Sequence, residues 1–143
     1  MSEADIDVVR DQFAATNEQD FARAMELYAE DVTLIASAAS GPGKSGTYEG
    51  KDAVGEWFGD WFRAFARGYH FEIHEIRELD SGVIFMRASH GGRGRLSGVE
   101  VQGETAYLYR VRDGKISQVG FYANPDEALG AAELPEWSRG QTD

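Results

Sequence analysis

The sequence predicts an α+β fold, in which helices from the first half of the chain pack on a sheet from the second half. Residues 50–67, GKDAVGEWFGDWFRAFAR, repeat bulky apolar residues at spacings of three and four, the period of one face of an α-helix. After this stretch the period changes, and residues 71–123 hold strand-length runs rich in aromatic and β-branched residues. Because so apolar a helix needs an equally large surface to pack on, we expect it to lie on that sheet.

The elements before the apolar helix are shorter. A first helix is expected over residues 3–16, and Asp20 can cap a second helix whose apolar stripe ends at Tyr28. The β-branched run 31–36 predicts a short first strand, and the small, polar, glycine-rich segment 37–50 predicts a long loop.

The second half reads as a largely antiparallel meander, since short turns separate sequential strands. Four strands are expected, at residues 71–79, 83–90, 104–112 and 115–123. Asp113-Gly114 between the last two is a strong hairpin signal. Asn124 can then cap, and Pro125 can open, a short helix that ends at Ala132.

Length and composition limit the classes of protein. The 143 residues suit one domain, which we place at 1–134, followed by a flexible C-terminal tail at 135–143. The formal net charge of −11 disfavours binding to nucleic acid or to an anionic membrane surface. The chain has no cysteine, which excludes disulfides and thiolate metal sites. Because the sequence shows neither a signal-peptide pattern nor an apolar run of roughly 18 residues, we expect a cytoplasmic protein.

Three segments carry a resemblance to a known family: NEQDFARAMELYAEDVTL at 17–34, YEGKDAVGEWF at 48–58 and YRVRDGKISQVGFYANPDEAL at 109–129. In their order and spacing the chain resembles SnoaL-like domains of the nuclear transport factor 2-like superfamily, which also contains ketosteroid isomerases and limonene-epoxide hydrolases. The resemblance implies a cone-shaped α+β barrel of cystatin-like type, whose curved, mostly antiparallel sheet wraps around N-terminal helices and encloses an apolar pocket. It also implies a homodimer through the outer face of the sheet, and we expect no cofactor.

The functional residues of ketosteroid isomerases transfer poorly to this chain. Those enzymes use a tyrosine, an aspartate base and a protonated aspartic acid, whose places fall on Gln12, Ala36 and Tyr107. The alanine cannot accept a proton, but Tyr107 can donate a hydrogen bond to a developing oxyanion.

The water-positioning Asp–Arg–Asp set of limonene-epoxide hydrolases has its nearest counterparts at Arg87, Ser89 and Asn124. The arginine is retained and could anchor an anionic group. Serine and asparagine can orient a water molecule but cannot deprotonate it, so this hydrolase mechanism does not transfer either.

His90 is the candidate proton shuttle, because a histidine titrates near neutral pH and could replace the missing carboxylates. The alternative is a histidine at a strand end that is hydrogen-bonded to backbone or water. The candidate catalytic set is therefore Tyr107, His90 and Arg87.

Several other residues could line the pocket and orient a flat apolar ligand. They are Tyr28, Trp57, Trp61, Tyr109, Phe121 and Asn124. For the aromatic members the alternative is plain core packing.

His70, Glu72 and His74 share one side of an expected strand and could form a facial metal triad, but a solvated polar face is favoured and no metal is expected.

These observations leave two hypotheses. In the first, the protein binds a small apolar or aromatic metabolite and acts as a cofactor-independent isomerase, cyclase or hydratase. In the second, it is a non-catalytic ligand-binding or protein-assembly module of the same fold.

Overall fold

A computed structural model describes residues 2–37, 45–63, 70–93, 98 and 100–138 of the chain. The end of the apolar helix expected at 50–67 lies outside the described residues. In chain order the elements are α1 (Ser2–Asn17), α2 (Phe21–Glu26), β1 (Tyr28–Ala36), β2 (Gly46–Glu49), α3 (Lys51–Arg63), β3 (His70–Glu78), β4 (Ile84–Arg93), β5 (Glu100–Arg112), β6 (Lys115–Tyr122), α4 (Pro125–Ala131) and α5 (Pro135–Ser138).

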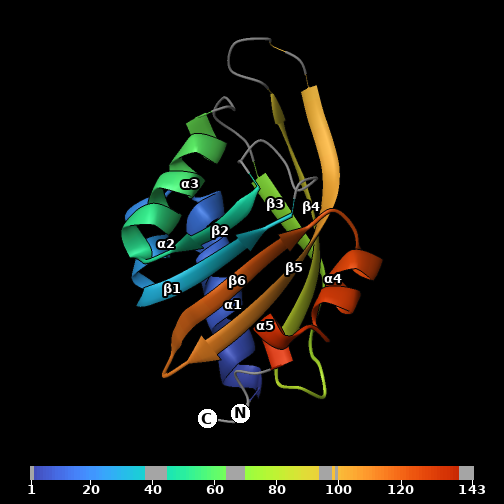
Figure 1. Cartoon of the computed structure of the whole chain (residues 1–143). Coiled ribbons are helices and arrows are strands. Elements are labelled where there is room, and N and C mark those ends of the chain that lie inside the picture. The colour runs from blue at the N-terminus through green and yellow to red at the C-terminus, as the bar shows by residue number, and fades with distance from the viewer. Residues whose placement is uncertain (1, 38–44, 64–69, 94–97, 99, 139–143) are drawn as a thin grey trace.

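The strands form one curved, unclosed sheet in the order β2-β1-β6-β5-β4-β3 (Figure 1). Strands β3 to β6 pair antiparallel with their chain neighbours, and β1 pairs antiparallel with β2, whereas β1 and β6 run parallel. The predicted α+β class and the mostly antiparallel sheet are therefore confirmed. In Figure 1, β4 and β5 extend beyond the other strands as a two-stranded arm.

Local signals fix several element ends as predicted. The Asp20 carboxylate accepts a hydrogen bond from Arg23 N and caps α2. Asn124 caps α4 in the same way, with Pro125 in its first turn. The hairpin between β5 and β6 turns at Asp113 and Gly114, whose φ angles of 55° and 77° suit the positive-φ turns that Asp-Gly favours.

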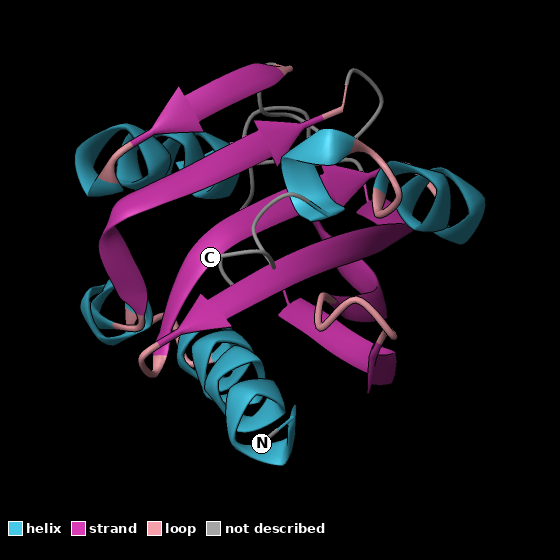
Figure 2. Cartoon of the chain, turned by 60° about the horizontal axis from the view of Figure 1, so that its bottom comes forward, coloured by secondary structure: helices cyan, strands magenta, loops and turns pink. Residues whose placement is uncertain are grey.

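Helices cover both faces of the sheet, and each face buries its own apolar cluster (Figures 1 and 2). We call the face toward α1 and α3 the inner face, and the face toward α4 and α5 the outer face. Alternation along β5 divides the residues between them: Tyr107 and Tyr109 belong to the inner cluster, and Ala106 and Leu108 to the outer one.

The structure differs from the sequence prediction at two places near the first strand. Tyr28 does not end the second helix; it begins β1, where it is 2% exposed and belongs to the inner cluster. Residues Gly46–Glu49, expected within a loop, form the edge strand β2 and pair with β1 from Thr33 to Ala36.

The chain end also differs in part from the expected tail. Pro135–Ser138 form the short helix α5, and its Trp137 is fully buried against the outer face of the sheet. Residues 139–143 lie outside the described part of the chain. No helix in the described part of the chain is long and apolar enough to cross a membrane.

Candidate functional site

A cavity of about 320 Å³ lies between the N-terminal helices and the inner face of the sheet. Helices α1, α2 and α3 supply one side of it, and strands β1, β3, β5 and β6 supply the other. Its lining residues are Gln12, Phe13, Thr16, Phe21, Ala24, Met25, Tyr28, Gly55, Phe58, Gly59, Trp61, Phe71, Tyr107, Tyr109 and Phe121. No charged residue is among them, in the part of the chain that the structure describes.

Aromatic rings meet edge to face along the sheet side of this cavity. Phe13 on α1 lies 5.3 Å from Phe71 and 5.6 Å from Tyr107, measured between ring centroids. The ring of Tyr107 in turn meets that of Phe121 at 4.9 Å. Such tilted contacts are the favoured geometry of aromatic pairs, and they hold the wall in a defined shape.

Three phenol groups belong to the cavity wall, on Tyr28, Tyr107 and Tyr109. Burial raises the pKa of Tyr28 well above its usual value, and the neighbouring phenol of Tyr107 raises it further. Burial raises the pKa of Tyr109 in the same direction, with additional contributions from the other two phenols. Tyr28 and Tyr109 are therefore neutral at pH 7, and each can offer a hydroxyl group to a ligand.

Gln12 and Thr16 add further polar groups to the lining, and both are 5% exposed. They lie one turn apart on α1, with the Gln12 side-chain amide donating to Thr16 Oγ1 at 2.8 Å. The Thr16 hydroxyl donates to the main-chain oxygen of Gln12 at 2.9 Å. The Gln12 Oε1 atom is buried and has no hydrogen-bond partner among the described residues.

His90 lies beside the cavity but is not one of its lining residues. It pairs with Phe71 across β3 and β4, so its ring shares the inner face, 6.1 Å from Phe71 and 6.0 Å from Trp61. Gly103 opposite leaves room for the imidazole, because an added Cβ would come within 3.2 Å of Nε2. Burial lowers the pKa of His90 below 6.5, which favours a neutral ring at pH 7.

Arg87, the third residue of the expected catalytic set, lies away from the cavity. It alternates with the inner-face residues Met86 and Ala88, so it projects from the outer face. There its guanidinium donates to Glu104 Oε2 at 3.3 Å and approaches Glu75 at 3.6 Å. The structure thus brings His90 and Tyr107 to one face but does not bring Arg87 to them.

Of the expected ligand-binding residues, four line the cavity: Tyr28, Trp61, Tyr109 and Phe121. Trp57 packs behind them, at 5.4 Å from Trp61 and 4.9 Å from Phe121. Asn124 does not line the cavity, because its side chain caps α4.

The metal triad considered for β3 does not form. His70, Glu72 and His74 are exposed, and His74 is hydrogen-bonded to Ser89. Among the described residues, no three metal-ligating side chains come together.

Several lining residues were not predicted as part of the pocket. The resemblance placed Gln12 at the position of a family tyrosine, but Gln12 and Thr16 stand at the edge of an apolar helix stripe, where a sequence pattern does not distinguish a solvated side chain from a buried one. Gly55 and Gly59 lie one turn apart in α3 and line the cavity without filling it. Their spacing of four within an aromatic helix was the available signal.

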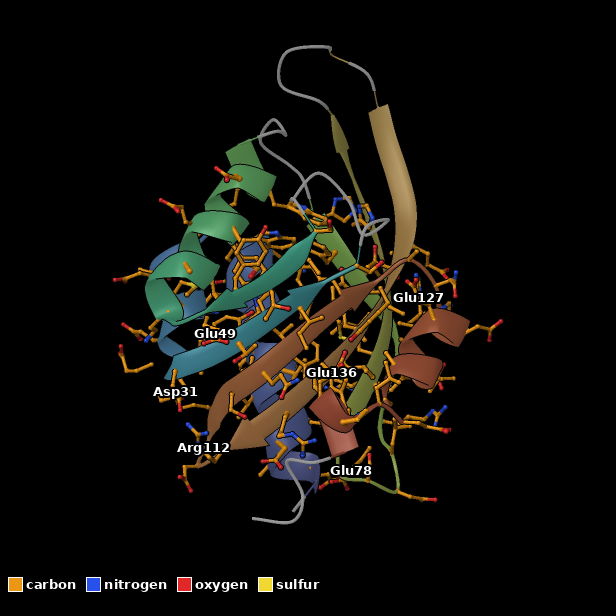
Figure 3. The ribbon with its side chains drawn as sticks, in the orientation of Figure 1. Asp31, Glu49, Glu78, Arg112, Glu127 and Glu136 are labelled. Atoms are coloured by element: carbon orange, nitrogen blue, oxygen red, sulfur yellow. The ribbon has the colours of Figure 1, made fainter. Side chains whose placement is uncertain are left out.

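Charged residues lie outside the cavity, on the surface of the sheet. Figure 3 shows Asp31 of β1 and Arg112 of β5 near one another, and their side chains form an ion pair at 2.7 Å. Arg112 lowers the pKa of Asp31 through this hydrogen bond. Both groups are solvent-exposed, so the pair is a surface feature rather than part of the site.

Comparison of the sequence with family models shows a match to a SnoaL-like domain over residues 9–119. A search of curated proteins found no match to the sequence.

Many solved structures share the fold. Bal32a, from a soil-derived mobile gene cassette, has a TM-score of 0.73 at 16% identity, over 85% of this chain and 89% of its own. RV0760c from Mycobacterium tuberculosis, solved in complex with estradiol-17beta-hemisuccinate, has a TM-score of 0.69 at 21% identity, over 85% and 94%. A Catenulispora acidiphila protein with a ketosteroid isomerase-like fold, in complex with trimethylamine, has a TM-score of 0.67 at 20% identity, over 90% and 93%.

Proposed function

The chain belongs to the SnoaL-like domain family, and we propose that it binds a small apolar or aromatic molecule in the cavity between its N-terminal helices and the sheet. The uncharged, aromatic lining of that cavity carries the proposal. A volume of about 320 Å³ lies within the range of small-molecule sites, which are lined mainly by apolar side chains and hold a few polar groups that orient the ligand.

The chemistry of the lining narrows the class of ligand. An anion would lose its hydration in a cavity without a positive side chain, and the net charge of −11 adds repulsion. A neutral molecule of two or three fused rings would instead bury its faces against Trp61 and Phe121. RV0760c, which shares the fold, was solved with estradiol-17beta-hemisuccinate, and the fused rings of that compound, unlike its charged succinate group, support a ligand of this kind.

Blocking the cavity tests the proposal. The probes are 2-naphthol and 2-methoxynaphthalene, measured by isothermal titration calorimetry and thermal shift. Leucine in place of Gly55 would extend from α3 past Met25 into the cavity, so G55L should abolish binding of both probes. G130L is the matched control, because an added Cβ at Gly130 meets nothing within 4 Å on the exposed side of α4. The proposal fails if wild-type protein binds neither probe, or if G55L binds them as well as G130L does.

Catalysis is a second candidate function, favoured by the position of His90 against Trp61 and Phe71 of the cavity wall. A neutral imidazole there could accept a proton, and the Tyr107 phenol could donate to an oxyanion, which would suit a cofactor-independent isomerase, cyclase or hydratase. In an assay for turnover of a bound ligand, H90Q should lose turnover while binding persists. Equal turnover by wild type and H90Q would exclude this role.

The expected homodimer and cytoplasmic location remain predictions. Helices α4 and α5 cover the outer face over Phe85 and Leu108, so a dimer through that face would form beside them. Size-exclusion chromatography with light scattering should then give twice the monomer mass.

A further inference from the structure

Gln12 brings to the cavity a polar atom whose hydrogen-bonding character is fixed by its neighbours. Gln12 Oε1 is buried, belongs to a side chain that lines the cavity, and has no partner among the described residues. The three phenols of the wall can each donate or accept, so they place few constraints on a ligand. An amide oxygen can only accept.

The hydrogen bonds between Gln12 and Thr16 decide which end of the amide faces the cavity. The Thr16 hydroxyl has a single hydrogen, and it uses that hydrogen to reach the main-chain oxygen of Gln12. Its oxygen can then only accept a hydrogen bond, which the Gln12 Nε2 group donates at 2.8 Å. The amide nitrogen is thus held by Thr16, and the amide oxygen is left for the cavity.

The reverse orientation of the amide is less favourable. With the oxygen turned toward Thr16, the hydroxyl could donate either to that oxygen or to the main-chain oxygen, but not to both. One of the two hydrogen bonds would be lost, and the Thr16 oxygen would lose its donor. The orientation of a glutamine amide is assigned from its whole hydrogen-bond network. The preferred orientation is therefore the one that keeps both bonds, from Gln12 Nε2 to Thr16 and from the Thr16 hydroxyl to the main-chain oxygen of Gln12.

We infer that Gln12 selects ligands that carry a hydroxyl or N–H donor, and that Thr16 positions it for this role. The inference rests on the proposed binding function and adds the chemical class of the ligand. A donor would satisfy the buried amide oxygen, whereas an ether or ketone at the same place would set two acceptors against each other. Ketosteroid isomerases, with which the sequence was compared above, have a tyrosine hydroxyl at this position that donates a hydrogen bond. This chain instead presents an acceptor there, the amide oxygen of Gln12.

Three probes with the same ring system measure this selection. 2-Naphthol carries a donor, while 2-methoxynaphthalene and 2-acetonaphthone carry only acceptors. We expect wild-type protein to bind 2-naphthol about tenfold more tightly than either acceptor-only probe, by calorimetry, since one buried hydrogen bond is worth about a factor of ten in affinity. Comparing affinities within one variant cancels changes in the shape of the cavity.

Substitutions on α1 then separate recognition from packing. Q12M keeps the length of the side chain and removes the acceptor, so the preference for 2-naphthol should disappear. T16V releases the amide and should also reduce the preference, whereas T16S keeps the hydroxyl and should retain it. Q118M is the matched control, because Gln118 is bonded to the Glu136 main-chain oxygen and does not line the cavity.

The outcomes are distinct from those that test binding itself. Equal affinity of wild type for 2-naphthol and 2-methoxynaphthalene would overturn the inference and leave the binding function intact. A preference for 2-acetonaphthone would also overturn it, because a donor of the cavity wall, and not the amide oxygen of Gln12, would then orient the ligand. Binding of none of the probes would overturn both proposals. If Q12M fails to fold, two measurements still test the inference. They are the ratio of wild-type affinities for 2-naphthol and the acceptor-only probes, and the same ratio in T16S compared with T16V.

Discussion

The indole nitrogen of Trp137 donates a hydrogen bond to the phenol oxygen of Tyr122 at 2.9 Å, on the outer face of the sheet. The bond joins α5 to β6, and Trp137 is fully buried. Burial raises the pKa of Tyr122 to about 12, so the phenol stays neutral and accepts the indole N–H over the physiological range. This pair stabilises the outer cluster, which packs behind the strands that carry the cavity wall.

Gly120 makes room for that pair, and an added methyl group should destabilise the protein. A Cβ at Gly120 would come within 2.7 Å of the Tyr122 ring and 2.8 Å of the Trp137 ring. We expect G120A to lower the free energy of unfolding by about 1–3 kcal/mol in urea denaturation, the usual effect of overpacking a core. G130A is the control and should unfold at the same urea concentration or a higher one, since Gly130 faces open space in α4. A G120A protein as stable as wild type would contradict the expected clash.

Asn17 should contribute to stability through the edge strand β3. Its side-chain oxygen accepts from Phe71 N at 2.8 Å, and its amide nitrogen donates to Phe71 O at 3.0 Å. We expect N17A to lower the free energy of unfolding by about 1–2 kcal/mol, since both bonds are lost. N17D should not restore it, because a carboxylate cannot donate to Phe71 O. D11A, at an exposed site on the same helix, should change stability by less than about 0.5 kcal/mol.

Burial of His90 predicts a pH dependence of stability. Its pKa is lower in the folded protein than in the unfolded chain. The neutral ring therefore contributes fully to the free energy of unfolding above about pH 6.5, and this contribution is lost as the pH falls through the pKa of the folded state. Between about pH 7.5 and about pH 5.5, wild-type protein should therefore lose more stability than H90Q in urea unfolding. H70Q, at an exposed position on β3, should follow wild type. Parallel profiles for wild type and H90Q would contradict the lowered pKa.

Burial of the phenol groups predicts that stability falls as the pH rises in the alkaline range. The pKa of Tyr28 is raised on folding, so its contribution is present below pH 10 and is lost as the pH rises above that value. Y28F, which cannot ionise, should lose less stability than wild type above about pH 10. The absorbance of phenolate should show Tyr28 ionising only as the chain unfolds. Ionisation of all tyrosines in folded protein would exclude this interpretation.

The sequence predicted those parts of the fold that depend on local chemistry. Caps at Asp20 and Asn124 and the turn at Asp113-Gly114 form as expected, because a side chain or a positive φ determines each. Tyr28 was misplaced because a helical stripe through Ala24 and Met25 reaches it with the right spacing. Pairing of β1 with β6, from Tyr28 opposite Ile116, determines the strand instead.

The candidate site was less predictable than the fold. Aromatic residues such as Trp61, Tyr109 and Phe121 were expected to line the pocket and do so. Arg87 was expected beside His90 because it matches the arginine of limonene-epoxide hydrolases, but their spacing of three places them on opposite faces of β4. The environment of Gln12 depends on the packing of α1 against distant strands, which no local pattern contains.

The parallel pairing of β1 with β6 also has a consequence for folding order. Thr33 lies opposite Gln118, so two strands from opposite ends of the chain must meet before the sheet is complete. Bringing two such distant segments together costs the entropy of closing a long loop. Domains with many contacts of this kind therefore fold slowly. Tyr28 and Phe121 of the cavity wall lie on these two strands, so the ligand pocket is completed only when nearly the whole chain has folded.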